Sequence, residues 1–225
     1  MVADPLATAA DVLLGAVAGG GHVALAGGST PRAAYQRAAA AEADWSRVVL
    51  WFGDERCVPP DDERSNFRMV REALLDPLGA AAPTVRRIEG ERGADVAAAA
   101  YERALGAAFE GRPARLDLVL LGLGPDVHTA SLFPGVPALD VQDALVAAVE
   151  VPGREPRVPR VTLTYPALNA AREVVFLVSG EDKAEAVERA FAAAPSPDAP
   201  ASLVRPTDGV LRVVLDAPAA SRLAR

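Results

Sequence analysis

The sequence predicts an α/β fold in which a mostly parallel sheet is covered by helices on both faces. Short apolar runs rich in valine and leucine alternate with longer segments of Ala, Glu and Arg that have helical period. This alternation is typical of strand–helix–strand units, and strands buried on both faces are apolar throughout, as these runs are. With 225 residues the chain is long enough to bury a substantial core, and we expect one domain spanning residues 1–225.

Each element follows from its local pattern. The expected strands are residues 22–26, 48–52, 116–121, 144–149, 174–178 and 211–215. The expected helices are residues 31–41, 66–75, 94–109, 182–194 and 217–223, with a weaker helical pattern over residues 6–17. Residues 195–200, PSPDAP, are the most linker-like segment, but only one strand and one short helix follow them. We therefore interpret this segment as a surface loop and not as a domain boundary.

Charge and composition limit the possible partners. The formal net charge is −7 at pH 7, so the surface repels polyanions and disfavours nucleic acid and anionic membranes as partners. A phosphate-bearing ligand must then meet a local basic pocket. The single cysteine, Cys57, excludes an internal disulfide, and no apolar run approaches the ~18 residues needed to span a bilayer. With no basic region before an apolar stretch near the start, we expect a cytoplasmic protein.

The first motif follows the first strand. The strand runs into Gly27, Gly28, Ser29 and Thr30, and a helix is expected to begin at Pro31 with Thr30 as its N-cap. Backbone N–H groups, two hydroxyls and the positive end of a helix dipole converge there, which favours an anion cradle for phosphate. The spacing fits neither a Walker A loop nor a nucleophile elbow. The alternative is a tight strand-to-helix turn without a ligand.

The second motif follows the second strand. The strand ends in a short charged run that includes Asp54 and Arg56, at the edge where open α/β sheets bind ligands. Arg56 is suited to pair with a phosphate or carboxylate through two hydrogen bonds. The alternative is a surface ion-pair cluster. A nucleophilic Cys57 is disfavoured, because a histidine partner is far away in sequence.

The third motif follows the third strand, and it contains Gly122, Gly124, Asp126 and His128. An acid two residues before a histidine, at the carboxyl end of a strand, suits an imidazole that transfers protons. The chain has only one other histidine, His22, which we interpret as structural. The glycine pattern lacks the third glycine of a dinucleotide site, and two histidines with one cysteine make a zinc site improbable. Aspartates such as Asp54 and Asp126 could bind Mg²⁺ together with water, but nothing in the sequence requires it.

These motifs occur together with PRVTLT at residues 159–164 and SGEDKA at residues 179–184. The ordered set, which covers nearly the whole chain, resembles the signature of the 6-phosphogluconolactonase family. The resemblance implies a glucosamine-6-phosphate-isomerase-like, Rossmann-type fold and hydrolysis of 6-phospho-D-glucono-1,5-lactone to 6-phosphogluconate, without a metal or cofactor. It also points to Arg160 and Lys183 as further substrate contacts, and Lys183 is the only lysine of the chain.

One residue departs from the family pattern. Where the family usually has Asp-Gly-His, this chain has Val127 between Asp126 and His128. A β-branched residue is strained at positive φ, so the sequence predicts either an ordinary backbone at Val127 or a shifted loop.

The mechanism expected from these residues uses His128 as general acid and base, oriented by Asp126, on a phosphorylated sugar lactone held by residues 27–30 and Arg56. A glucosamine-6-phosphate isomerase or deaminase is the nearest alternative, but its pattern usually continues towards Asn-Glu-Pro where this chain has Ser131, Leu132 and Phe133. A sugar-phosphate-sensing domain without catalysis is less favoured, since neither length nor basic charge remains for a DNA-binding module. We expect a monomer or a small homo-oligomer.

Overall fold

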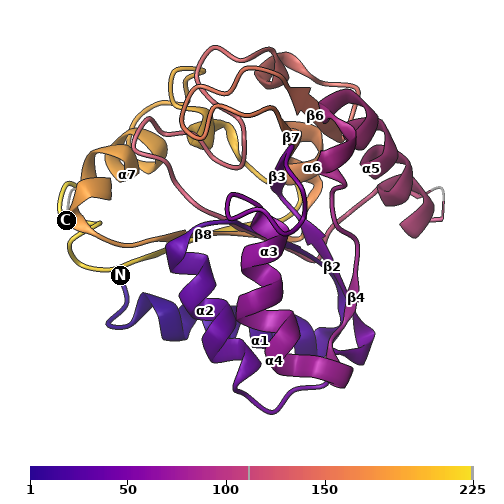
Figure 1. Cartoon of the computed structure of the whole chain (residues 1–225). Helices are drawn as coiled ribbons and strands as arrows, with labels where there is room; N and C mark the ends of the chain where they lie inside the picture. Colours follow the sequence, from indigo (N-terminus) through magenta and orange to yellow (C-terminus); the bar gives the residue numbers. More distant parts are fainter. Residues whose placement is uncertain (111, 224–225) are drawn as a thin grey trace.

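The computed structural model describes residues 1–110 and 112–223, and a parallel sheet forms its centre (Figure 1). The strand order of this sheet is β4-β2-β1-β5-β8-β9, and every neighbouring pair is parallel. The strands are β1 (Gly21–Leu25), β2 (Val48–Phe52), β4 (Thr84–Val85), β5 (Leu118–Leu121), β8 (Glu173–Val178) and β9 (Val210–Leu215). Five of the six expected strands lie here, within two residues of their predicted bounds.

Helices cover both faces of this sheet, as predicted. On one side lie α1 (Pro5–Gly19), α2 (Ser29–Ala39), α3 (Asn66–Val70) and α4 (Asp76–Leu78), and on the other lie α5 (Ala94–Ala108), α6 (Tyr165–Ala170) and α7 (Ala184–Phe191) (Figure 1). Between α3 and α4 the helix continues as a π-helical turn, η2 (Arg71–Leu75). The predicted helix 182–194 is shorter than expected, because its first turn is the 3₁₀ segment η6 (Glu181–Lys183). Further 3₁₀ turns are η1 (Trp45–Arg47), η3 (Gly79–Ala81), η4 (Gly90–Arg92), η5 (Pro137–Asp140) and η7 (Pro200–Leu203).

A second, antiparallel sheet in the described chain has the order β3-β7-β6. Its strands are β3 (Asp54–Arg56), β6 (Val146–Val149) and β7 (Arg160–Leu163). The expected strand 144–149 therefore exists but belongs to this sheet and not to the parallel one. Neither β3 nor β7 was expected from the sequence, because their charged and hydroxyl residues do not form an apolar run. This small sheet lies on the same side of the parallel sheet as α5 and α6 (Figure 1).

The predicted helix 217–223 is wrong, because these residues form turns. The carboxylate of Asp216 accepts hydrogen bonds from the backbone N–H of Ala219, at 2.8 Å, and of Gly180, at 3.0 Å. The side chain of Asp216 thereby ties the end of β9 to the loop after β8. The bond to Ala219 is one that can also cap a helix, but only single turns follow it: the N–H of Ser221 donates to the Pro218 carbonyl and the N–H of Leu223 to the Ala220 carbonyl.

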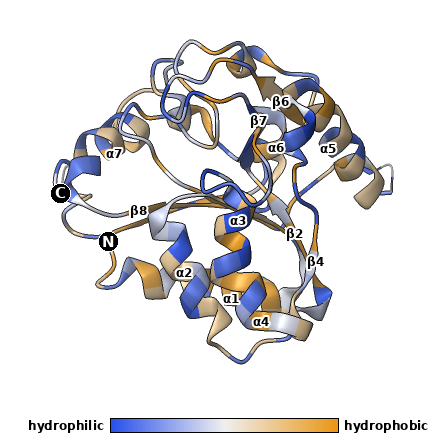
Figure 2. Cartoon of the chain, in the orientation of Figure 1, coloured by the Kyte–Doolittle hydropathy of each residue, from blue (hydrophilic) through white to orange (hydrophobic). Residues whose placement is uncertain are grey.

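The core lies between the helical layers and the parallel sheet. Its largest fully buried side chains include Trp45, Trp51, Tyr35, Phe52 and Phe133. Figure 2 shows hydrophobic colour along the central strands and hydrophilic stretches on the outer faces of α2 and α7. None of the described helices is long and apolar enough to cross a membrane.

His22 is a structural residue at the amino end of β1, as the sequence analysis expected. Its Nδ1 accepts a hydrogen bond of 2.9 Å from the indole N–H of Trp51, and its ring packs against Phe109 with centroids 4.5 Å apart. Burial lowers the pKa of His22 from its usual value of 6.5, although the nearby Asp117 carboxylate opposes this. The folded protein therefore holds the neutral imidazole.

Because the pKa of His22 is lower in the folded than in the unfolded state, this stabilisation is complete above pH 6.5 and is lost as the pH falls through the folded value. We expect the free energy of unfolding, measured in urea, to decrease between pH 7 and pH 5. In His22→Asn, whose amide oxygen can still accept the Trp51 bond, that decrease should be smaller. His128→Asn is the control, and its free energy of unfolding should decrease with pH as much as that of the wild type. An equal decrease in His22→Asn and in the wild type would show that His22 is not the group responsible.

Candidate active site

A pocket of about 280 Å³ lies at the carboxyl edge of the parallel sheet. The loops that follow β1, β2, β5 and β8 form most of its wall, and β7 of the small sheet adds one arginine. The predicted site residues that line the pocket are Gly27, Gly28, Ser29, Thr30, Asp54, Arg56, His128, Arg160 and Lys183. Asp126 does not line the pocket and contacts His128 instead. The structure thus brings together residues that lie up to 156 positions apart in the chain, from Gly27 to Lys183.

The loop after β1 supplies the amino terminus of a helix. Helix α2 begins at Ser29 with Gly28 as N-cap, so the prediction of Thr30 as N-cap is wrong. Gly28 has φ of +111°, a conformation that glycine adopts readily, and no side chain caps the helix. The hydroxyl of Thr30 lies 3.3 Å from that of Ser179 instead. The first turn of α2 therefore opens on the pocket with uncapped N–H groups, which is a favourable position for an anion.

The strand β3 carries Asp54, which is buried at the back of the pocket. Its carboxylate accepts hydrogen bonds from the Ser131 hydroxyl, at 2.6 Å, and from the Asn66 amide, at 3.0 Å. Gly27 must be glycine here, because a Cβ at that position would overlap the Asn66 side chain. These bonds fix one carboxylate oxygen to the loop after β5 and the other to the start of α3.

Glu55 points the other way and organises the segment between β3 and α3. Its buried carboxylate accepts hydrogen bonds of 2.7 Å from the backbone N–H groups of Arg56, Asn66 and Phe67. Burial raises the pKa of Glu55 against the effect of these donors. The Glu55 carboxylate thus joins the end of β3 to the start of α3, and this contact holds Arg56 beside the pocket.

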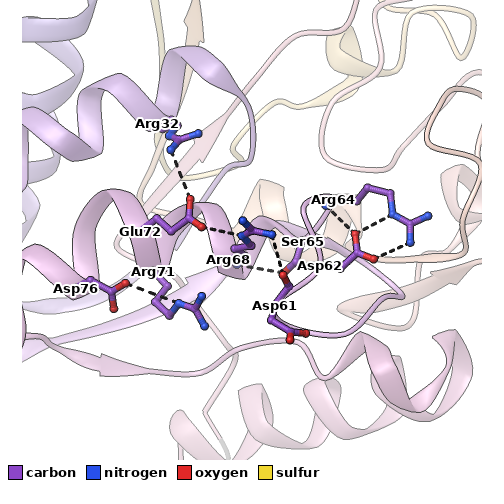
Figure 3. Close-up of polar contacts among 9 residues, drawn as sticks. All are labelled: Arg32, Asp61, Asp62, Arg64, Ser65, Arg68, Arg71, Glu72 and Asp76. Atoms are coloured by element: carbon purple, nitrogen blue, oxygen red, sulfur yellow. Dashed lines mark hydrogen bonds and ion pairs between the residues drawn. The ribbon is translucent and has the colours of Figure 1, made fainter.

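Ion pairs cover the outer side of this loop (Figure 3). Glu72 pairs with Arg68 at 2.7 Å and with Arg32 of α2 at 3.5 Å, and Arg64 pairs with Asp62 at 2.7 Å. These pairs are exposed, so each contributes little to stability. Arg56 belongs to none of these pairs, and its Nη1 donates to the backbone carbonyl of Arg64 at 2.5 Å. The alternative that Arg56 belongs to a surface ion-pair cluster is therefore not supported.

The loop after β5 positions the two residues expected to transfer protons. Nδ1 of His128 lies 2.5 Å from Oδ1 of Asp126. Burial is the largest single influence on Asp126 and raises its pKa. The hydrogen bond and charge of His128, together with backbone N–H donors, outweigh burial and hold the pKa of Asp126 below its usual value. An ionised carboxylate fixes the proton on Nδ1 and leaves Nε2 with a free lone pair. Gly124 permits this arrangement, because a Cβ there would overlap the His128 ring.

Val127 adopts the left-handed conformation, with φ of +66°, so the first of the two expected alternatives, an ordinary backbone, is wrong. Such a conformation costs a β-branched residue about 1–3 kcal/mol. The side chain is fully buried in the core, and the carbonyl of Val127 accepts a hydrogen bond of 2.9 Å from Ala201. Burial of a valine contributes about 1.5–3 kcal/mol, which offsets the strain.

Three cations reach the pocket without a close carboxylate partner among the described residues. Lys183 is 24% exposed, and its Nζ lies 4.0 Å from Asp182. Arg160 is buried, which lowers its pKa although the Asp54 carboxylate opposes this. Nε of Arg56 and Nε of Arg160 are both buried without a hydrogen-bond partner. In a chain of net charge −7, this is the local basic pocket that a phosphate ligand requires.

Two lining residues with polar side chains were absent from the predicted set, Asn66 and Ser179. Ser179 directly follows β8, so its place at the carboxyl edge of the sheet was the available signal. Asn66 begins α3, ten residues after β3, and no comparable local signal marks it. Cys57 lines a separate groove beside α5, and burial raises the pKa of its thiol to about 11, which argues against a nucleophile. Within residues 1–110 and 112–223, no group of three His, Cys, Asp or Glu side chains is arranged to hold a metal ion.

An open parallel sheet with a basic pocket at its carboxyl edge defines an α/β protein of the kind that binds small ligands at that edge. The family model described as glucosamine-6-phosphate isomerases/6-phosphogluconolactonase matches residues 2–213, and the chain belongs to this family.

Relatives within the family are similar over most of their length. A 6-phosphogluconolactonase of Nostoc sp. is 40% identical over 208 residues, which cover 89% of this chain and 84% of the relative. A human 6-phosphogluconolactonase is 38% identical over 92% of this chain and 79% of its own. The structure of a Trypanosoma brucei 6-phosphogluconolactonase superposes with a TM-score of 0.87 at 29% identity, covering 98% of this chain and 95% of that one. A monomeric glucosamine-6-phosphate deaminase, 18% identical with a TM-score of 0.81, shares the fold.

Replacing Val127 separates strain from packing. Val127→Ala keeps an L-residue at positive φ and loses the two buried methyl groups, whereas Val127→Gly loses these and Cβ but relieves the strain. We expect both variants to unfold at lower urea concentration than the wild type, with the glycine variant more stable than the alanine variant by about 1 kcal/mol. A glycine variant that is the less stable of the two would show that position 127 is not strained.

Proposed function

We propose that this chain is a 6-phosphogluconolactonase that hydrolyses 6-phospho-D-glucono-1,5-lactone to 6-phosphogluconate. The observation that carries this proposal is the Asp126–His128 pair, with Nδ1 and Oδ1 2.5 Å apart, beside a pocket lined by a helix amino terminus and three cations. The activity named for relatives of about 40% identity supports the same reaction. The pocket of about 280 Å³ lies at the small end of the range for ligand pockets, which suits a single phosphorylated sugar.

Substrate binding uses the charge of the pocket. We assign the phosphate and hydroxyl groups of the lactone to residues 27–30 together with Arg56, Arg160 and Lys183, with Asp54 accepting a hydroxyl hydrogen bond. Charge-assisted hydrogen bonds from these groups hold the part of the substrate that does not react. That binding energy fixes the lactone carbonyl close to His128.

The chemistry needs one imidazole in two steps. Nε2 of His128 takes a proton from water as the water oxygen bonds to C1 of the lactone, giving a tetrahedral oxyanion. The C1–O5 bond then breaks as the oxyanion collapses to the carboxylic acid, and Nε2 returns its proton to O5. Asp126 stabilises the imidazolium between the steps. We assign the oxyanion to backbone N–H groups at the start of the loop after β5 or at Gly28. Pro125 has no N–H, and the N–H of Gly124 donates to the His128 carbonyl at 2.9 Å, so neither is assigned this role.

This mechanism requires no metal ion, and we place the reaction in the cytoplasm. The ligand is a small phosphorylated lactone, and a net charge of −7 disfavours nucleic acid as a partner. We retain a monomer or a small homo-oligomer as the assembly to be tested.

The first test is hydrolysis of freshly generated 6-phosphogluconolactone in the presence of EDTA, corrected for spontaneous opening of the ring. We expect rapid turnover by the wild type and a loss of about 100- to 10,000-fold in kcat for His128→Ala, the contribution of a general acid–base group. The control is His22→Asn, which changes the other histidine at the opposite edge of the sheet and should retain full activity. Folded wild type with no rate above the spontaneous one would refute the proposal.

The role of Asp126 is tested by Asp126→Asn. The amide is neutral, and it can donate to Nδ1 and so move the imidazole proton to Nε2, where it blocks the base. We expect kcat to fall by about 100-fold with a smaller change in KM. Asp117→Asn is the matched control, because Asp117 accepts the backbone N–H of His22 at 2.8 Å, far from the pocket. Equal activity of Asp126→Asn and Asp117→Asn would remove Asp126 from the mechanism.

A further inference from the structure

The ring of Phe133 contacts two of the residues assigned to the pocket. Its centroid lies 4.4 Å from that of the His128 imidazole, with 34° between the ring planes. The guanidinium carbon of Arg160 lies 5.1 Å from the same centroid. Phe133 itself is fully buried and does not line the pocket. One aromatic ring therefore touches the proposed base and a proposed substrate-binding cation.

Apart from this ring, the guanidinium of Arg160 is held only by backbone carbonyls among the described residues. Its Nη2 donates to the backbone carbonyls of Arg154, at 3.3 Å, and Pro156, at 3.0 Å, while its buried Nε has no partner. A buried guanidinium without a paired carboxylate gains stabilisation from an aromatic face. The ring thus supports the charge of Arg160 without neutralising it, so the cation stays available to an anionic ligand.

Phe133 is itself held on several sides. Two residues earlier, Ser131 donates its hydroxyl to Asp54 at 2.6 Å and its backbone N–H to the Thr162 hydroxyl of β7 at 3.1 Å. Gly153 packs on the ring so closely that a Cβ there would lie 3.1 Å from Phe133 Cβ. The ring therefore has little freedom to move, and its position is set by the same strand that carries Arg160.

We propose that Phe133 is a positioning residue that holds the imidazole of His128 and the guanidinium of Arg160 at a fixed separation. This inference rests on the proposed function, since it assigns turnover to His128 and substrate binding to Arg160. A flexible aliphatic side chain of similar size fills the same space but offers neither a flat stacking surface nor a negative ring face. Loss of the Phe133 ring therefore affects KM through Arg160 and kcat through His128.

The test is Phe133→Leu, and the chain supplies a closely matched control. Phe109 packs on the other histidine, His22, with centroids 4.5 Å apart and 35° between planes, at the opposite edge of the sheet. We expect Phe133→Leu to raise KM and lower kcat, with kcat/KM falling by about 100-fold, the effect of displacing reacting groups by about 1 Å. Phe109→Leu, which removes an equivalent contact, should keep the wild-type kcat and KM. Equal kinetics of the two variants would overturn the proposal.

A double-mutant cycle identifies the partner. If Phe133 acts on binding through Arg160, the effect of Phe133→Leu on KM should largely disappear when Arg160→Gln is also present. The effect of Phe133→Leu on kcat should persist. Independent effects of the two changes on KM would remove Arg160 from the proposal.

Proton NMR of the two imidazoles gives a readout that does not depend on turnover. The short Nδ1–H bond of His128 to Asp126 should give a downfield proton signal, which Phe133→Leu broadens or removes and Phe109→Leu leaves in place. A wild type without lactonase activity would refute the proposed function, and this signal would still decide the role of the ring. An unchanged signal in Phe133→Leu would overturn that role.

Discussion

The parallel direction of neighbouring strands is the constraint on which the rest of the structure depends. Because β2, β1, β5 and β8 are adjacent and parallel, their carboxyl ends open on one edge of the sheet. The glycine-rich loop after β1, the charged run after β2, the His128 loop after β5 and the segment of Lys183 after β8 therefore meet in one pocket. His22 lies at the amino end of β1, so the same constraint keeps the second histidine out of the site.

A buried polar network joins the two sheets at this edge. Asp54 receives hydrogen bonds from Ser131 and Asn66, and Ser131 in turn reaches Thr162 of β7. Buried polar groups that are fully paired specify one arrangement of the chain, since each broken bond leaves an unsatisfied group. The network sets β7 against the pocket, and in this way Arg160 joins residues that come from the parallel sheet.

The His128 loop shows how a site can carry strain that the surrounding core offsets. Val127 and Ala130 both have positive φ, at +66° and +48°, in a segment whose neighbours are fixed by packing. Valine is poorly suited to that backbone, but its side chain lies in the core while His128 turns to the pocket. The left-handed turn, the close approach of Gly124 and the bond to Asp126 together aim the imidazole.

Much of this protein could be predicted from its sequence, and the limits have physical causes. Apolar runs alternating with helical segments determined the α/β class, because burial on both faces demands uniformly apolar strands, and loops after such strands indicated the site residues. Only the tertiary structure decided the antiparallel sheet. Strands β3 and β7 have no local apolar pattern, and they form because they pair with each other and with β6. The tertiary structure also formed turns and not a helix at residues 217–223, and it placed Phe133 between His128 and Arg160. Local periodicity determines which segments are strands and helices, whereas contacts between distant segments depend on how those elements pack.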